Sequence, residues 1–331
     1  MGSPRASLII RCYNEEAHIG KLLYGLQAQA DVDFETIVVD SGSTDRTVEI
    51  SRSYGAKLVF INPEDFTFGR ALNLGCSHAR GEYLVFASAH VYPTHKHWLK
   101  TLLKPFANSR IGAVYGKQRG GDTSQFSEHR IFEQWFPEKD IAVQDTPFCN
   151  NANCAVRRSL WQEVPYDEEI TGLEDLKWAK EIVGMGFRVA YAADAEIIHI
   201  HDETPRTIMN RYRREAIALK QTYPEQRMNF GSFVNLLTRN VLADYAHAAR
   251  SGQLFHTITE IPTFRLMQFW GAYLGFRQSG TVPKKLKQTF YYPSMSNGQP
   301  PQRMLADSRH PPIDYPHPMQ EQQVAQGEAR I

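Results

Sequence analysis

Short runs of β-favouring residues alternate with helical patterns along the first third of the chain, and this alternation restricts the fold more than any other feature. Such alternation builds βαβ units and a mainly parallel sheet. Four repeats within about a hundred residues therefore predict an α/β fold with flanking helices. The strands are expected at 7–11, 36–40, 57–61 and 83–86, and the helices at 19–26, 45–54, 70–79 and 96–106.

The regular alternation ends near Lys117, and a long polar stretch follows from Gln118 to Asn151. It is expected to contain a short helix at 126–136, and stretches of this length in compact domains are commonly functional. Helical patterns mixed with basic and aromatic residues resume near Thr207. We therefore expect an α/β domain at 1–205, a helical extension at 206–290 and a flexible tail rich in Pro and Gln at 291–331.

Composition excludes several classes of protein. Lys and Arg total 37 against 36 Asp and Glu, so no global charge favours a nucleic-acid partner. The four cysteines form no C-x-x-C pair, which argues against a zinc site or a disulfide framework. Reduced thiols in a cytoplasmic protein are the simplest interpretation.

The sequence shows no targeting or membrane-spanning segment. The apolar run near the start, Leu8-Ile9-Ile10, is too short for a signal peptide. A myristoylation signal is rejected because Ala6 stands where Ser or Thr is required. No stretch reaches the roughly 18 apolar residues that a spanning helix needs. We therefore expect a cytoplasmic location.

Polar residues gather where the predicted strands end. In an open α/β sheet, ligands bind at the carboxyl ends of the strands. Those ends carry residues 11–15 (Arg-Cys-Tyr-Asn-Glu), 40–43 (Asp-Ser-Gly-Ser) and 88–90 (Ser-Ala-His). Asn14 is also suited to cap the helix that follows it, with Glu15 and Glu16 at the positive end. Neither a G-x-G-x-x-G turn nor a Walker loop is present, so dinucleotide and P-loop enzymes are not indicated.

Two of these side chains suit a nucleotide base. The Asp40 carboxylate can accept hydrogen bonds from a pyrimidine N–H, and Tyr13 can offer the face of its ring. The alternative for Asp40 is a purely structural Asx turn or helix cap.

The motifs and their order resemble the GT-A fold glycosyltransferases of family 2 over about two hundred residues. Segments 11–16 and 39–45 resemble the nucleotide-binding loops of that family, and in the second loop an aspartate contacts the base. The subgroup that the chain resembles most is the bacterial rhamnosyltransferase-like enzymes of surface polysaccharide synthesis. That resemblance rests partly on 68–70 and on Trp270-Gly271-x-x-x-Gly275. Further segments resemble the helix beside the donor (69–75), the strand before the metal motif (81–86) and the motif with the catalytic base (172–175).

The resemblance implies an inverting transferase that moves a sugar from a UDP- or dTDP-sugar to a glycan or lipid-linked acceptor. Asp175 would be the catalytic base, and Glu174 would orient an acceptor hydroxyl or support a metal. Both are also suited to the first turn of a helix running to about Gly184, and the two roles are compatible. The donor-binding set would be Arg11, Tyr13, Glu15, Asp40 and the turn Ser41-Gly42-Ser43.

The sequence departs from the family at Ser88-Ala89-His90, where relatives commonly carry Asp-x-Asp to hold magnesium or manganese. His90 can ligate a borderline metal such as manganese, or, when protonated, it can donate a hydrogen bond to the β-phosphate. Ser88 can donate a hydrogen bond to a phosphate oxygen. A divalent metal is therefore an open prediction. The alternative is a satisfied histidine in a protein that has lost activity.

Other basic and amide side chains are weaker candidates. His201, from the pair His199-Ile200-His201, would complete a metal shell or touch the diphosphate, although a structural pair is equally consistent with the pattern. One of three arginines could neutralise the leaving group or form a basic, lipid-facing patch. Asparagines in segment 150–158 suit sugar hydroxyls or turns. The arginines are Arg211, Arg213 and Arg214.

Two other functions remain to be weighed. A GT-A-fold protein that binds nucleotide or glycan without turnover would fit the missing Asp-x-Asp. A nucleotidyltransferase is disfavoured because no glycine- and lysine-rich phosphate loop is present. The basic and aromatic helices after Thr207 also predict peripheral contact with a membrane.

Overall fold

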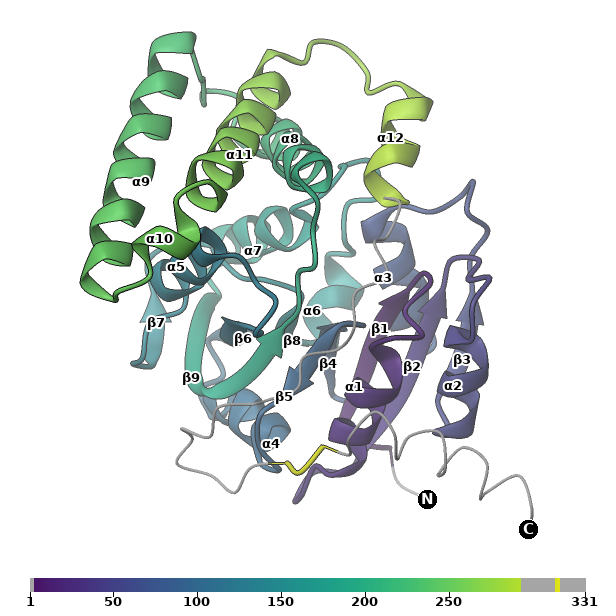
Figure 1. Cartoon of the computed structure of the whole chain (residues 1–331). Coiled ribbons are helices and arrows are strands. Elements are labelled where there is room, and N and C mark those ends of the chain that lie inside the picture. Colours follow the sequence, from purple (N-terminus) through teal and green to yellow (C-terminus); the bar gives the residue numbers. More distant parts are fainter. Residues whose placement is uncertain (1–2, 293–312, 316–331) are drawn as a thin grey trace.

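The computed structural model of the chain describes residues 3–292 and 313–315. In that part of the chain, one sheet has the order β3-β2-β1-β4-β8-β6-β9-β5, with β7 paired to β9 (Figure 1). The strands are β1 (Ala6–Cys12), β2 (Phe34–Asp40), β3 (Lys57–Phe60), β4 (Tyr83–Ser88), β5 (Val91–Pro93), β6 (Ile111–Gly120), β7 (Ile141–Gln144), β8 (Asn153–Arg157) and β9 (Arg188–His199).

Strands β1 to β4 are parallel, and so are β6 and β9, whereas β8 runs antiparallel between β4 and β6. The expected α/β fold with a mainly parallel sheet is thereby confirmed. The helices are α1 (Ile19–Gln27), α2 (Thr47–Ser53), α3 (Phe68–Ser77), α4 (Trp98–Leu103), the 3₁₀ turn η1 (Lys104–Ala107), α5 (Phe126–Trp135), α6 (Arg158–Glu163), α7 (Glu174–Gly184), α8 (Pro205–Thr222), α9 (Phe230–Arg250), α10 (Leu254–Thr257), α11 (Glu260–Arg277) and α12 (Lys284–Tyr291).

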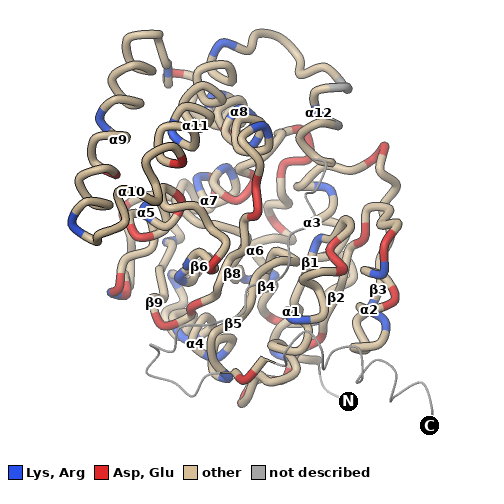
Figure 2. The backbone as a smooth tube through the Cα atoms, in the orientation of Figure 1, with Lys and Arg blue, Asp and Glu red and all other residues tan. Residues whose placement is uncertain are grey.

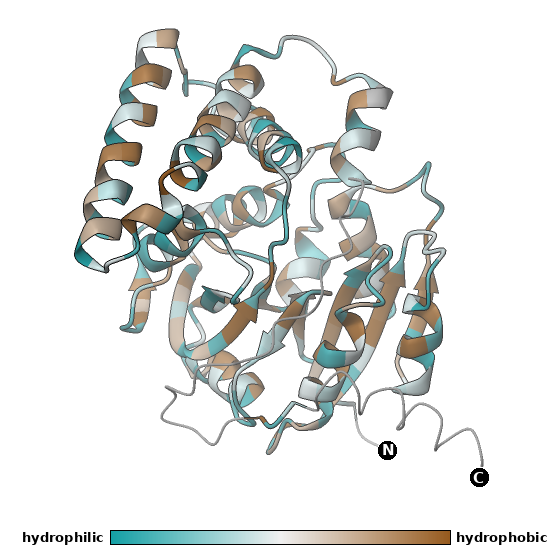
Figure 3. Ribbon diagram, viewed as in Figure 1, coloured by the Kyte–Doolittle hydropathy of each residue, from teal (hydrophilic) through white to brown (hydrophobic). Residues whose placement is uncertain are grey.

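Both faces of the sheet are covered, and this follows from the alternation of side chains along a strand. On β1, Leu8 and Ile10 pack with α1 and α4, whereas Ile9 between them packs with α3 and α7. A strand buried on both sides needs apolar residues at successive positions, and Figure 3 shows such brown strands at the centre of the molecule. The two cores fix the strand ends on which the site is built.

The loop after β1 differs from the expectation. Helix α1 begins at Ile19 with His18 in the capping position, so Asn14 does not cap it. Asn14 instead adopts a left-handed conformation (φ 53°), and its side chain accepts a hydrogen bond from the backbone N–H of Thr44. Asparagine tolerates this conformation better than most residues. The residue therefore ties the first strand-end loop to the second.

The polar stretch 118–151 contains more regular structure than expected. The short helix is confirmed as α5, but β6 continues to Gly120 and β7 occupies 141–144. Strand β9 ends at His199, so His201 lies just beyond it. The sequence did not reveal β7 because only its ends pair with β9, across an irregular register.

Helices α8, α9 and α11 form a layer beside the sheet domain (Figure 1). Two glycines let α11 approach α8 closely. A Cβ on Gly271 would lie 2.3 Å from the carbonyl oxygen of Met209, and one on Gly275 would lie 2.5 Å from that of Arg213. Among the described residues, no helix combines the length and apolarity needed to cross a bilayer. The division of the chain at residue 205 stays a prediction.

Part of the expected tail packs against the α/β domain. Tyr291 lies against Phe66 and Phe68, and Tyr292 against Tyr13. Tyr315 donates a hydrogen bond to the Pro93 carbonyl at 2.7 Å. The rest of the predicted tail, 293–312 and 316–331, lies outside the described residues.

Candidate active site

The predicted strand-end motifs meet at one edge of the sheet. Arg11 on β1 is in register with Val39 on one side and with Ser88 on the other. Asp40 is the next residue along β2, paired with Cys12. Parallel pairing thus places the three predicted segments side by side, as expected for strands whose carboxyl ends share an edge.

The two carboxylate oxygens of Asp40 are in different situations, because one is engaged in a turn and the other is free. Its Oδ1 accepts hydrogen bonds of 3.0 Å from the backbone N–H groups of Gly42 and Ser43, which is an Asx turn. Its Oδ2 is buried and has no hydrogen-bond partner in the described part of the chain, and the residue is 2% exposed. Because a buried oxygen without a partner is costly, Oδ2 is suited to receive an N–H from a ligand.

Tyr13 lies beside this turn. Its ring meets that of Tyr292 edge to face, with centroids 4.5 Å apart. The ring of the predicted base-binding residue therefore contacts a side chain that directly follows α12, a contact for which the sequence offered no signal.

Glu174 and Asp175 open helix α7, and the residue before them is in an unusual conformation. Leu173 has φ 52°, a left-handed value that a branched side chain rarely adopts. Glu174 forms an ion pair with Arg11 at 2.9 Å, which joins the start of α7 to the end of β1. The strained residue therefore directs both carboxylates toward the strand-end edge.

Asp175 is buried and held by backbone donors. Its Oδ2 accepts from the N–H of Asn151 at 2.9 Å and its Oδ1 from the N–H of Leu176 at 2.7 Å. Burial, followed by the charge of Glu174, raises the pKa of Asp175 to about 7. A carboxyl group with that pKa is suited to accept a proton near neutral pH.

Of the three arginines on α8, Arg214 contacts the segment before these carboxylates, since its Nε lies 3.2 Å from where a Cβ on Gly172 would stand. Its guanidinium lies 4.7 Å from the centroid of Phe68, whose ring Arg11 also contacts at 4.8 Å. By contrast, Arg211 is paired with Glu128 and Glu203. Arg214 is therefore the better candidate for a cation close to the reacting groups.

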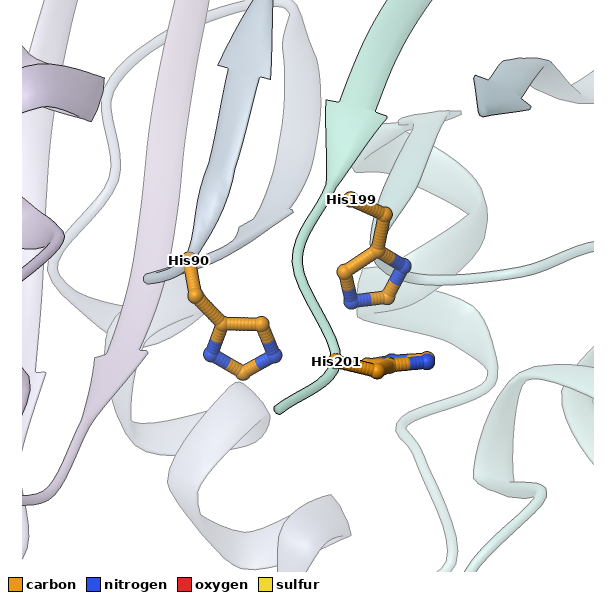
Figure 4. Close-up of side chains that lie close together, drawn as sticks. All are labelled: His90, His199 and His201. Carbon is orange, nitrogen blue, oxygen red and sulfur yellow. The ribbon is translucent and has the colours of Figure 1, made fainter. Parts of the chain in front are cut away.

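Three histidines, His90, His199 and His201, form a cluster at the same edge of the sheet (Figure 4). One ring nitrogen of each lies within 4.8 Å of the others. The rings of His90 and His199 stack with centroids 5.2 Å apart, and those of His199 and His201 are 4.1 Å apart. The sequence prediction named His90 and His201 as ligands but gave His199 no such role.

The histidine cluster is held by oxygen atoms from several elements. Glu15 forms a hydrogen bond of 2.9 Å with the Nδ1 of His90. A residue predicted to bind the nucleotide-sugar donor therefore contacts the cluster. Buried Glu128 on α5 bonds the Nδ1 of His201 at 2.6 Å. Burial opposes the charge of Glu128, but His201 and Arg211 lower its pKa to about 2. Neither Glu128 nor its role was predicted, because a glutamate in a polar stretch carries no distinctive signal.

The charge states of the rings differ. Burial lowers the pKa of His199 well below its usual value, and His201 and His90 add to this effect. Burial also disfavours charge on His90, but the Glu15 carboxylate outweighs it and raises the pKa of that ring. The cluster thus combines a neutral imidazole with one that readily takes a proton. Ser88, which with His90 stands in place of the acidic Asp-x-Asp pair, is half-buried at the end of β4.

The asparagines near Asp175 divide into two roles. Both polar side-chain atoms of Asn151 are buried and find no hydrogen-bond partner among the described residues, which leaves them for a ligand. Asn153 instead accepts from the indole of Trp98 and donates to the carbonyls of Lys117 and Ala195. The sugar-binding interpretation therefore fits Asn151, whereas Asn153 is structural.

A mainly parallel α/β sheet with polar residues at its strand ends, and with an acidic pair that opens helix α7, is an arrangement of the GT-A type. Residues 7–164 match the model of the glycosyl transferase family 2. This match covers a little under half of the chain, and it supports a family 2 type of domain and glycosyltransferase as the enzyme class.

Two curated relatives are O-antigen chain rhamnosyltransferases. WbaN of Salmonella anatum is 28% identical over 222 residues, which cover 63% of this chain and 70% of the relative. RfbN of Salmonella typhimurium is 28% identical over 221 residues, with the same coverage of 63% and 70%. The predicted resemblance to rhamnosyltransferase-like enzymes is thereby confirmed.

Among solved structures, the chain is similar to the mannosyltransferase PcManGT from Pyrobaculum calidifontis in complex with GDP-Man and Mn²⁺. The TM-score is 0.57 at 22% identity, and 88% of each chain is covered. The similarity supports the GT-A fold over most of the chain, including helices beyond the family match.

Proposed function

We propose that this protein is an inverting glycosyltransferase that moves a sugar from a UDP- or dTDP-sugar to a glycan or lipid-linked acceptor in polysaccharide synthesis. The observation that carries the proposal is the position of Asp175. This buried carboxyl group, with a pKa raised to about 7, stands at the edge where the strand-end motifs meet.

The proposed reaction is a single in-line displacement. Asp175 takes the proton of an acceptor hydroxyl while that oxygen bonds the anomeric carbon, and the bond from this carbon to the diphosphate oxygen breaks. One displacement inverts the anomeric configuration. Glu174, fixed by its ion pair with Arg11, orients the acceptor hydroxyl beside Asp175.

The donor is proposed to lie along the ends of β1, β2 and β4. The free Oδ2 of Asp40 accepts an N–H of the base, and Tyr13 offers an apolar surface to it. The Ser41 hydroxyl, which donates to the Cys12 carbonyl, and the Ser43 N–H, which donates to Asp40, shape the same turn. Arg214 supplies positive charge toward the departing diphosphate, which is the charge that must be stabilised.

A divalent metal ion would also stabilise the charge of the departing diphosphate. The residues fit one, because the His199 Nε2 is buried next to His90 and His201 and none of the residues that the structure describes forms a hydrogen bond with it. When bound, such an ion neutralises charge on the diphosphate. The histidine cluster rather than an Asp-x-Asp pair would hold it.

Release of nucleoside diphosphate from UDP- and dTDP-sugars, with acceptor glycans present, tests the proposal. Asp175→Asn is expected to lower the rate by about 100-fold or more, as loss of a general base does. The matched control Asp145→Asn changes an exposed carboxylate and should leave the rate unaltered. NMR of the product should show inversion at the anomeric carbon.

An unchanged rate in Asp175→Asn would exclude this residue as the base. Nucleotide binding without transfer across the whole donor panel would favour a binding protein instead.

We further propose that α9 and α10 dock on an anionic membrane surface. They expose Leu242, Phe255 and Ile258, and Phe255 is 87% exposed. The only acidic residue between Asn229 and Thr259 is Asp244, which is buried in an ion pair with Arg265. An apolar face whose exposed charges are basic suits anionic lipid, and Figure 2 shows blue segments along α9.

The contact differs from the one expected from the sequence. Arg211 is buried among glutamates, and Trp270 and Tyr273 pack against Phe233.

Flotation with anionic and zwitterionic vesicles tests the proposal. Phe255→Ser should abolish flotation with anionic vesicles, whereas the control Phe60→Ser, which changes an exposed residue on β3, should not. Failure of the unmodified protein to float would refute the membrane contact.

A further inference from the structure

We propose that His90, His199 and His201 together bind one borderline divalent metal ion, of the zinc and cobalt class, in preference to magnesium. This inference deepens the proposed function, on which the role of the ion rests, by naming the metal site of the transferase. Metal binding itself is measured without donor or turnover, so the two proposals can fail separately.

The three imidazoles converge from different parts of the chain. His90 follows β4, His199 ends β9, and His201 lies two residues further on. One nitrogen of each is within 4.8 Å of the others, and Figure 4 shows a nitrogen of His90 and one of His199 facing each other. Metal–imidazole bonds are about 2.0 to 2.1 Å long, so only a modest approach of the rings brings three nitrogens onto one ion.

The Nε2 of His199 shows that the cluster is incomplete. His199 is 6% exposed, and this nitrogen has no hydrogen-bond partner among residues 3–292 and 313–315. Its Nδ1 is engaged at 2.8 Å by the Oε1 of Gln118. An amide oxygen can only accept, so Nδ1 carries the proton and Nε2 presents a lone pair. A buried lone pair beside two other imidazoles is suited to a metal ion.

The three rings are held in the same manner, because each Nδ1 faces an oxygen from another part of the chain. In His199 this leaves the buried Nε2 for an ion. Bonds of this kind from outside the ligand set fix the tautomer and raise the basicity of metal-bound histidines. The oxygen partners are Glu15 for His90, Gln118 for His199 and Glu128 for His201.

A second set, Glu128, His201 and Glu203, also has ligand atoms close enough for a metal. That set already holds a cation. The guanidinium of Arg211 lies 2.8 Å from Glu128 and 2.5 Å from Glu203. In the histidine cluster, Arg211 reaches only the Glu128 carboxylate behind His201, whereas His90 and His199 contact Glu15 and Gln118. The histidine cluster is therefore the better site for the ion.

The chemistry of the ligands determines which ion is preferred. Magnesium favours oxygen ligands in a near-ideal octahedron, as an Asp-x-Asp pair supplies. Imidazole nitrogen suits zinc, iron, copper and nickel better than magnesium. Replacing the acidic pair by Ser88 and His90, with His199 and His201 alongside, is therefore expected to change the metal preference.

The test uses the full chain after removal of metal by a chelator. Co²⁺ is titrated as a probe, and its visible absorption reports binding by nitrogen ligands. The expected result is one tight Co²⁺ per chain that excess Mg²⁺ does not displace. X-ray absorption of the zinc-loaded protein should show three imidazoles on the ion. Fewer than three imidazoles, or displacement of Co²⁺ by Mg²⁺ at similar concentration, would overturn the proposal.

Variants locate the site. His199→Ala and His90→Ala should each weaken Co²⁺ binding by more than the about 10- to 100-fold that loss of an outer partner costs. The control His256→Ala removes an exposed imidazole on α10 and should leave binding unchanged. Equal affinity in the wild type and in both cluster variants would overturn the site. His90 is part-exposed, with 27% of its side chain accessible, so its variant is informative even if His199→Ala fails to fold.

Discussion

The Oε1 of Glu15 lies 2.9 Å from the Nδ1 of His90. The loop after β1 thus orients a ring that stands after β4, although 75 positions separate the two residues in the chain. Glu15 was predicted as a donor-binding residue, and its contact gives it a positioning role within the same site.

Glu15→Ala is expected to weaken Co²⁺ binding by about 10- to 100-fold, because the His90 ring loses the oxygen that fixes its tautomer. Glu49→Ala, which removes an exposed carboxylate paired with Arg46, is the matched control and should have no effect. Titration of both variants with Co²⁺ provides the measurement. An affinity in Glu15→Ala equal to that of the control would show that the contact does not support the ring.

The pH dependence of turnover should follow Asp175. Burial and the charge of Glu174 raise its pKa to about 7, and only the deprotonated carboxylate can act as a base. Below that pH the protonated fraction grows, so kcat/KM should fall about tenfold per pH unit and should level off above it. Initial rates across the pH range test this. A rate that stayed constant through neutral pH would contradict the assignment.

Arg11→Ala should destabilise the protein by about 3 kcal/mol, because it leaves the Glu174 carboxylate buried without its partner. The two side chains are 21% and 6% exposed. Urea unfolding measures the loss. The double variant Arg11→Ala, Glu174→Gln should recover part of it, since no charge is then left buried. A double variant no more stable than Arg11→Ala would show that the ion pair is not the cause.

Gly271→Ala should lower the free energy of unfolding by about 1 to 3 kcal/mol, as overpacking does. The added Cβ would lie 2.3 Å from the Met209 carbonyl oxygen, a backbone atom that cannot turn away. Gly184→Ala is the control, because nothing lies within 4 Å of a Cβ at that position. If both variants unfold at the same urea concentration, the close approach of α11 to α8 does not depend on Gly271.

The fold was predictable because its signals are local. The strands and helices of the first hundred residues follow from periodicity and from the residues at their ends. Strand β7 was not predictable, since its pairing with β9 depends on contacts distant in sequence. The capping role assigned to Asn14 was wrong because a tertiary hydrogen bond to Thr44 overrides a local preference.

The site was predictable at the strand ends and less so elsewhere. Arg11 and Asp40 lie near each other because the parallel pairing of β1 with β2 brings their segments to one edge, and the ion pair with Arg11 joins Glu174 of α7 to that edge. The partners Gln118 and Glu128 come from a polar stretch without periodicity, so no pattern marked them. His199 stood beside a predicted ligand, but its inward Nε2 depends on burial, which the sequence does not state.

The buried pair of Asp244 and Arg265 bears on how separable the two parts of the chain are. Asp244 on α9 also accepts a hydrogen bond from Ser127 on α5 at 2.7 Å. Ser127 precedes Glu128, whose charge depends on Arg211 of α8. The catalytic sheet and the helices are therefore not interchangeable modules. A chimera joining residues 1–205 to the helices of another transferase would leave Glu128 without its cation unless the incoming helices supplied an equivalent arginine.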